Sequence, residues 1–212
     1  GVASAGFDAR RRKANNVFYF LDSNASAARW VSADPAPDEW TSQFASSGVK
    51  GESLSAVFPW VRPQGWHADA PATALPVPTA EVLSDTSEGA TRTIRLKVSS
   101  RRGAPMLLAY AEDGAALRRA FLNGKPLLDN SSAAADGRRS PLRLSYAAPP
   151  AEGFELLLEV DPSAPLRLTV QDISFGLPQL PGQQLTPRPA HMMPAPAFRS
   201  SDTTVVGRDF NF

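Results

Sequence analysis

The sequence predicts an all-β fold: a two-sheet antiparallel sandwich or jelly roll with Pro-rich loops covering one end. Three observations support this prediction. Twenty prolines are spread through the 212 residues, and proline interrupts helices. Short apolar or alternating segments recur between turn signals about every 8–12 residues, which is typical of a β-sandwich. Hydrophobic residues make up 42% of the chain and charged residues 20%, which is a globular composition.

The first residues are polar and precede the first strand-like segments. Residues 1–14 are expected to be a linker or a cloning remnant, so one β-sandwich domain is expected over residues 15–212. The segments Val17–Asp22 and Ala27–Ser32 flank a polar turn and together predict a β-hairpin.

The next part of the chain alternates between turn and loop signals. Asp38 and Glu39 follow two prolines and predict the start of a short helix towards Phe44. Residues 45–80 are rich in Pro, Ser and Ala, and we expect them to lie over the core as a loop.

The middle of the chain gives the clearest strand pattern. In Thr91–Ser100, apolar Ile94 and Leu96 alternate with Arg95 and Lys97, which predicts a strand with one buried and one wet face. Asn123-Gly124 predicts a tight hairpin turn. Further strands are predicted at Pro105–Asp113, Leu117–Leu122, Leu142–Tyr146, Phe154–Val160, Leu166–Ser174 and Thr203–Phe212. A Pro-rich segment, 177–197, lies before the last of them.

The alternating positions predict a core. Burying one Leu or Phe side chain stabilises a fold by roughly 1.5–3 kcal/mol, so these positions should dominate stability. The predicted core residues are Phe18, Phe20, Ile94, Leu96, Val98, Leu107, Phe121, Leu156, Leu158, Leu168 and Val170.

Charge and residue usage exclude several classes of function. The 22 basic residues nearly cancel the 21 acidic ones, and a net charge of +1 does not favour nucleic acid as a partner. The absence of cysteine excludes disulfides, thiolate metal sites and a cysteine nucleophile. No apolar run reaches the roughly 20 residues that span a bilayer, and no phosphate-binding or nucleophile-elbow motif is present.

One set of residues imitates a di-zinc hydrolase. His67-Ala68-Asp69, the acid pair Glu112-Asp113 and His191 follow one another as metal ligands and a base could. However, the first group is expected in a loop, and the acid pair lies at a strand end where acids form turns. We therefore expect no catalytic, cofactor-binding or metal-binding residue in this chain.

Two other features have alternative interpretations. Trp30, Trp40, Trp60 and Trp66 could form a platform that stacks on sugar rings, although core packing is the commoner fate of tryptophan. The basic run Arg10–Lys13 is interpreted as a solvated linker or a juxtamembrane positive segment rather than a nucleic-acid-binding arm.

The end of the chain carries a family resemblance. The segments Gly176–Gly182, Thr186–Pro196 and Ser201–Phe212 resemble the C-terminal end of bacterial membrane-bound di-zinc aminopeptidases, which are relatives of the endoplasmic-reticulum metallopeptidase. The resemblance covers roughly residues 15–212, and its tail motif is more specific than its other blocks. Those other blocks are Asn15–Asp22, Ala28–Phe44, Leu122–Leu127, Tyr146–Val160 and Pro165–Pro178.

The resemblance implies a role for the chain. In that family a zinc peptidase domain precedes several membrane helices and an extracytoplasmic C-terminal domain, and the zinc ligands and catalytic glutamate belong to the peptidase domain. The chain is therefore expected to be a non-catalytic accessory domain on the periplasmic face, tethered to the membrane. Its expected partners are the upstream peptidase and transmembrane regions of its own polypeptide. The alternative, based on the tryptophans, is a module that binds glycan or peptide.

Overall fold

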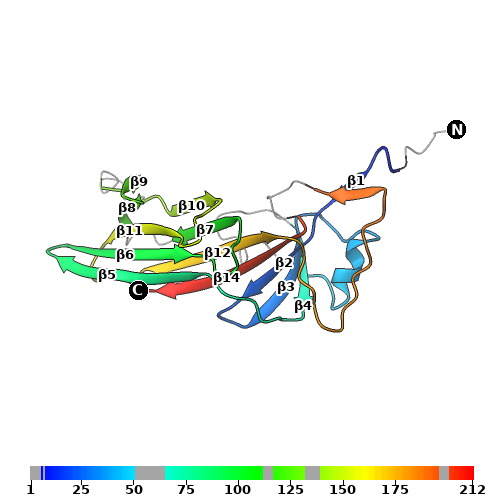
Figure 1. Cartoon of the computed structure of the whole chain (residues 1–212), viewed down its shortest axis with the longest axis horizontal. Coiled ribbons are helices and arrows are strands. Elements are labelled where there is room, and N and C mark those ends of the chain that lie inside the picture. Colours follow the sequence, from blue (N-terminus) through cyan, green and yellow to red (C-terminus); the bar gives the residue numbers. More distant parts are fainter. Residues whose placement is uncertain (1–5, 7, 51–64, 112–116, 132–138, 196–200) are drawn as a thin grey trace. The chain divides into compact units, whose positions relative to one another are not determined.

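A computed structural model describes residues 6, 8–50, 65–111, 117–131, 139–195 and 201–212. This part of the chain is almost entirely β-structure, with several strands packed in sheets and one short 3-10 helix, η1 (Thr41–Ala45) (Figure 1). The predicted all-β sandwich class is thereby confirmed, as is the predicted helical turn towards Phe44. Among the described elements, no helix has the length and apolarity needed to cross a membrane.

The chain divides into two compact units. The first unit comprises Gly1–Leu21, Ser26–Ala74 and Phe175–Val205. The second comprises Asp22–Ala25, Leu75–Ser174 and Val206–Phe212. The expectation of one domain over residues 15–212 concerns both units together and stays a prediction.

The second unit is built from two antiparallel sheets. One has the strand order β5-β6-β11-β8-β9, and the other contains the order β10-β7-β12-β14. The bounds in the first sheet are β5 (Thr79–Glu88), β6 (Thr91–Ser99), β8 (Leu117–Leu122), β9 (Lys125–Asp129) and β11 (Phe154–Val160). Those in the second are β7 (Met106–Ala111), β10 (Leu142–Ala147), β12 (Arg167–Phe175) and β14 (Thr203–Asn211), whose first residues belong to the first unit.

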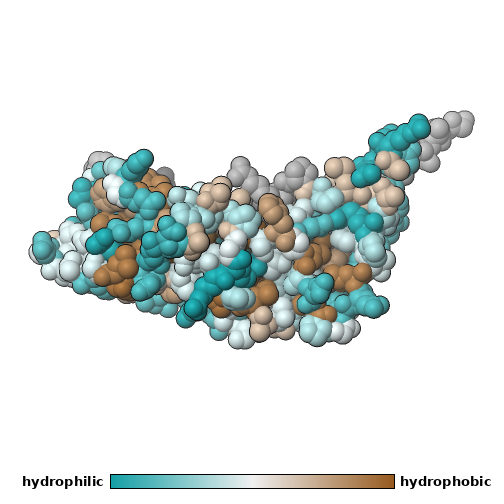
Figure 2. Space-filling model, viewed as in Figure 1, coloured by the Kyte–Doolittle hydropathy of each residue, from teal (hydrophilic) through white to brown (hydrophobic). Residues whose placement is uncertain are grey.

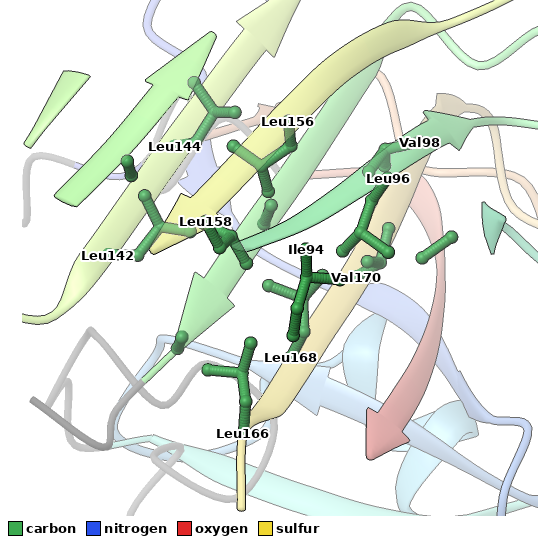
Figure 3. Close-up of a cluster of buried hydrophobic side chains, with 14 of the residues drawn as sticks. Ile94, Leu96, Val98, Leu142, Leu144, Leu156, Leu158, Leu166, Leu168 and Val170 are labelled. Atoms are coloured by element: carbon green, nitrogen blue, oxygen red, sulfur yellow. The ribbon is translucent and has the colours of Figure 1, made fainter. Parts of the chain in front are cut away.

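The core of the second unit lies between these sheets. Figure 3 shows aliphatic side chains from β6, β10, β11 and β12 pointing toward one another. In β6, the charged residues Arg95 and Lys97 alternate with the core residues, and hydrophilic residues cover much of the visible face of this unit in Figure 2. The predicted core is confirmed at Phe18, Phe20, Ile94, Leu96, Val98, Leu107, Leu156, Leu158, Leu168 and Val170.

Phe121 was expected in the core, and the structure corrects this. The register pairs Ala120 with Leu158 and Phe121 with Leu157, so Phe121 lies on the outer face of the sheet. It is partly exposed, and the Arg119 guanidinium carbon lies 5.7 Å from its ring centroid.

The Asn123-Gly124 turn is confirmed. Leu122 pairs with Lys125 across the turn, and both turn residues have positive φ, 47° at Asn123 and 77° at Gly124. Positive φ at both central residues matches the right-handed twist of the flanking strands. The Asn123 side-chain oxygen also accepts a hydrogen bond from the Glu155 N–H at 2.8 Å.

The first unit contains three neighbouring sheet strands, β2, β3 and β4, and a two-stranded ribbon. In the sheet, β2 (Phe18–Asp22) neighbours β3 (Ala27–Ser32), as the predicted hairpin requires, and β3 pairs antiparallel with β4 (Trp66–Ala70). In the ribbon, β1 (Lys13–Asn15) pairs in parallel with β13 (Met192–Pro194).

Two parts of this description differ from the expectations. The loop expected over residues 45–80 contains β4 and the first residues of β5. The strand β4 is buried at its first residues and pairs antiparallel with β3, although it has only five residues. The strand β1 likewise begins at Lys13, within the segment expected to be a linker.

Candidate functional site

Three of the four tryptophans, Trp30, Trp40 and Trp66, are core residues of the first unit. Trp30 and Trp66 are each 1% exposed and Trp40 is 7% exposed. The Phe44 ring joins two of them, with centroids 4.7 Å from Trp30 and 5.1 Å from Trp40. Their faces are therefore covered by protein, and these three residues do not form the sugar-stacking platform considered from the sequence. Trp60 lies outside the described residues.

The residues that imitate a zinc site lie on separate elements. His67 is buried in β4 rather than placed on a loop, whereas Asp69 is exposed and pairs with Lys50 at 3.1 Å. His191 contacts the Glu39 carboxylate at 2.5 Å. Glu112 and Asp113 lie outside the described residues. Within the part of the chain that is described, no three His, Cys, Asp or Glu side chains gather as metal ligands would.

A polar cluster instead joins segments that are far apart in the sequence. We call it the Arg188 cluster; it comprises Asn15, Asp38, Trp40, Arg188 and Asp202. The Arg188 guanidinium donates two hydrogen bonds to the Asp202 carboxylate, one of them at 2.7 Å, and its Nε donates to the Asn15 side-chain oxygen at 2.9 Å. Its carbon lies 4.0 Å from the Trp40 ring centroid, within the range of a cation–π interaction.

Asp38 is the most heavily hydrogen-bonded carboxylate of the cluster. It accepts from the Thr41 N–H at 2.8 Å, the Asn15 side-chain amide at 3.0 Å and the Trp40 N–H at 3.0 Å. Lys13 Nζ lies 3.3 Å away. Burial alone would raise the pKa of Asp38, but these hydrogen bonds outweigh burial and lower the pKa to about 2.

The neighbouring carboxylate, Asp34, responds in the opposite direction. Burial is the main cause that raises its pKa above the ordinary value, and the negative charge of Asp38 adds to this effect. The Asn16 N–H donates to Asp34 at 2.8 Å and opposes the rise without reversing it. Asp34 and Asp38 are therefore close carboxylates with pKa values shifted apart.

The C-terminal Pro-rich segment packs within the first unit. The Trp40 indole N–H donates to the Thr186 carbonyl at 2.7 Å, and the Thr186 N–H donates to the Gln43 side-chain oxygen at 2.8 Å. Leu180 and Met192 of the same stretch are buried. The described part of segment 177–197 therefore belongs to the fold of this unit.

The geometry of the Arg188 cluster is that of a structural clasp. The charged groups of Arg188, Asp202 and Asp38 all have protein partners, and the cluster ties three segments of the chain together. Sequence reasoning identified Trp40 and the turn at Asp38 but not Asn15, Arg188 or Asp202. Arg188 and Asn15 are 173 positions apart in the sequence, and a contact between such distant residues cannot be predicted from a local sequence pattern.

Comparison of the chain with protein-family models, with curated proteins and with solved structures found no match.

Proposed function

We propose that the chain is the extracytoplasmic C-terminal domain of a bacterial membrane-bound di-zinc aminopeptidase, where it acts as a non-catalytic accessory domain. Its role is to support or position the peptidase domain of its own polypeptide on the periplasmic face of the membrane. The zinc ions and the groups that hold them belong, in this proposal, to the upstream peptidase domain.

One observation carries the proposal. Two blocks of the resemblance, Ala28–Phe44 and the tail block Thr186–Pro196, contact each other through Trp40, Arg188 and Thr186. Residues that carry the family resemblance thus also hold distant segments of the first unit together. A motif with this distribution is typical of a scaffold, because its side chains face protein partners rather than a substrate.

The described residues do not fit a di-zinc centre. His67 is buried in β4 and His191 contacts Glu39, and no cluster of three ligand side chains is found in the described ranges. The chain's own chemistry therefore offers hydrogen bonding, ion pairing and packing, which are the properties an accessory domain uses.

A paired experiment tests the proposal in the parent polypeptide. The variant Arg188→Met opens the clasp, whereas Arg143→Ser changes an exposed arginine of the second unit and serves as the control. We expect Arg188→Met to lower the membrane abundance or the aminopeptidase activity of the parent several-fold, and Arg143→Ser to leave both unchanged. Equal abundance, kinetics and substrate selectivity for the two variants and the wild type would contradict the accessory role. So would a parent without a zinc peptidase domain.

A further inference from the structure

The turn between β8 and β9 contains a chemically reactive pair, Asn123 followed by Gly124. Both residues are exposed, and a Cβ atom placed on Gly124 would meet no other atom within 4 Å. Asparagine is a labile residue, because the nitrogen of the following peptide can attack its side-chain carbonyl carbon. Glycine has no side chain to obstruct that attack. Every other asparagine precedes a bulkier residue; these are Asn15, Asn16, Asn24, Asn130 and Asn211.

The reaction consumes one water molecule and releases one ammonia molecule. The Gly124 nitrogen loses its proton and bonds to Asn123 Cγ, the bond from Cγ to Nδ2 breaks, and Nδ2 leaves as ammonia. Water then opens the five-membered imide. Attack of water at Cγ gives aspartate, whereas attack at the main-chain carbonyl carbon gives isoaspartate, in which the main chain runs through Cβ and Cγ.

The folded turn opposes the first step. The φ angles are 47° at Asn123 and 77° at Gly124, and Leu122 pairs with Lys125 across the turn, which together define a type I′ turn. In such a turn ψ at the first central residue is about +30°. This angle places Asn123 Cβ and the Gly124 nitrogen on opposite sides of the Cα–C bond, whereas closure of the imide ring needs them on the same side.

Two hydrogen bonds to Glu155 in β11 hold Asn123 in this conformation. The Asn123 N–H donates to the Glu155 carbonyl at 2.9 Å, and the Asn123 side-chain oxygen accepts from the Glu155 N–H at 2.8 Å. The following strand, β9, is held less firmly, because it is the edge strand of its sheet and only Leu128 is shielded from solvent in part. Opening of such an edge needs less free energy than global unfolding.

We propose that Asn123 is a site of spontaneous deamidation that reacts only when the hairpin of β8 and β9 opens. An aspartate at this position still offers an oxygen to the Glu155 N–H. An isoaspartate adds a methylene group to the main chain of a two-residue turn, so the pairing of Leu122 with Lys125 cannot form again. The modification therefore converts a transient opening of the hairpin into a lasting loss of β9 from the sheet edge.

Peptide mapping by mass spectrometry tests the site. The full chain is incubated in mildly alkaline buffer, with and without urea, and deamidation is followed at each asparagine. In the unfolded chain we expect Asn123 to react faster than every other asparagine. In the folded chain its rate should fall by roughly tenfold or more, because the open hairpin is a minor state. Equal rates at Asn123 in the two states, or a faster asparagine elsewhere in the unfolded chain, would overturn the proposal.

Two neighbouring leucines of β9 provide matched variants. Leu128 packs against the core, whereas the Leu127 side chain is 37% exposed. Leu128→Ala should raise the rate at Asn123 in the folded chain several-fold, and Leu127→Ala should leave that rate unchanged. If Leu128→Ala does not fold, wild-type chain in urea below its unfolding transition serves instead, and its rate should rise with urea. A rate that neither Leu128→Ala nor urea increases would contradict gating by the hairpin.

The two products separate the chemistry from its structural effect. Asn123→Asp reproduces the aspartyl product and should unfold at the wild-type urea concentration, whereas the isoaspartyl fraction purified from incubated chain should unfold at a lower one. Equal midpoints would contradict the loss of β9. These assays need no parent polypeptide, so their failure would leave the accessory role standing.

Discussion

The strands β6 and β11 of the second unit bury alternate residues, such as Ile94 in β6 and Leu156 and Leu158 in β11, and the residues next to these are wholly or partly exposed. In the first unit, by contrast, β2 buries every residue from Phe18 to Leu21. Side chains alternate between the two faces of a strand. The strands β6 and β11 of the second unit therefore have one core face, whereas β2 is covered on both. The comparison teaches that the second unit depends on aliphatic packing between sheets, whereas the first depends on aromatic rings and the Arg188 cluster.

Each unit also contains an arginine–aspartate ion pair that is at least partly buried. In the second unit, Asp172 is fully buried and pairs with Arg102 at 2.6 Å. In the first, the Asp202 carboxylate that pairs with Arg188 retains 28% exposure. Because breaking a pair is costlier where water cannot replace the lost partner, the two arginines should differ in their effect on stability.

The largest effect is expected from Arg102→Met. The change leaves the Asp172 carboxylate buried, with the Ser100 hydroxyl still donating to it, and removing one member of a buried pair costs about 3–5 kcal/mol. Arg95→Met, at an exposed pair with Glu155, should cost much less, because water screens an exposed ion pair and replaces the lost partner. Urea unfolding followed by far-UV circular dichroism measures both, and similar losses would contradict the assigned burial.

Leu158→Ala should follow in magnitude. It removes buried methyl groups from the core between the sheets and should cost about 2–5 kcal/mol. Phe121→Ala, on the outer face of the adjacent strand, should cost about 1 kcal/mol. The same unfolding experiment checks the difference, and a larger loss at Phe121 would mean that the register is wrong.

Arg188→Met tests the first unit. It removes charge-assisted hydrogen bonds to Asp202 and Asn15 and the contact with Trp40, which should cost about 2–3 kcal/mol. All four tryptophans lie between Trp30 and Trp66, so tryptophan fluorescence during urea unfolding reports on this unit. The control Arg167→Met breaks an exposed pair with Asp209 and should cost less than about 1 kcal/mol. An unchanged fluorescence midpoint in Arg188→Met would remove the clasp interpretation.

The smallest effect is a difference in acid sensitivity. The pKa of Asp38 is lowered from 3.8 to about 2, so its contribution to stability is full above pH 3.8 and is lost as pH falls towards 2. Asp38→Asn should flatten this loss, by about 1 kcal/mol after allowing for partial solvent exposure.

Asp34 should act with the opposite sign. Its raised pKa means that the folded state takes up this proton at a higher pH than the unfolded state does, so stability gains as pH falls. Asp34→Asn should therefore steepen the acid loss. Stability measured between pH 2 and 7 checks both variants, and parallel curves would contradict the assigned shifts.

The sequence predicted the second unit better than the first for a physical reason. Period-two alternation in Thr91–Ser99 and Phe154–Val160 directly indicates half-buried strands, and Asn123-Gly124 indicates a tight turn from its residue types alone. The strand β5 was missed because most of its residues are exposed and show no alternation. The strand β4 was missed because it is short and lies among proline-rich segments.

The candidate site was less predictable than the fold. The sequence located the tryptophans but could not decide between a ligand platform and a core, because that choice depends on which residues cover the rings. Covering residues such as Thr186 and Arg188 lie more than 140 positions from Trp40 in the chain. The ribbon of β1 and β13 could not be predicted for the same reason, because its two three-residue strands come from distant segments of the chain.

The most direct test of the accessory role compares the intact parent polypeptide with a version lacking residues 15–212. Zinc per chain is measured together with aminopeptidase activity and membrane abundance. We predict that the truncated parent keeps its zinc stoichiometry but loses activity or abundance, and that the isolated chain binds no zinc and hydrolyses no peptide. Stoichiometric zinc with turnover in the isolated chain, or a truncated parent equal to the intact one in every respect, would contradict the account.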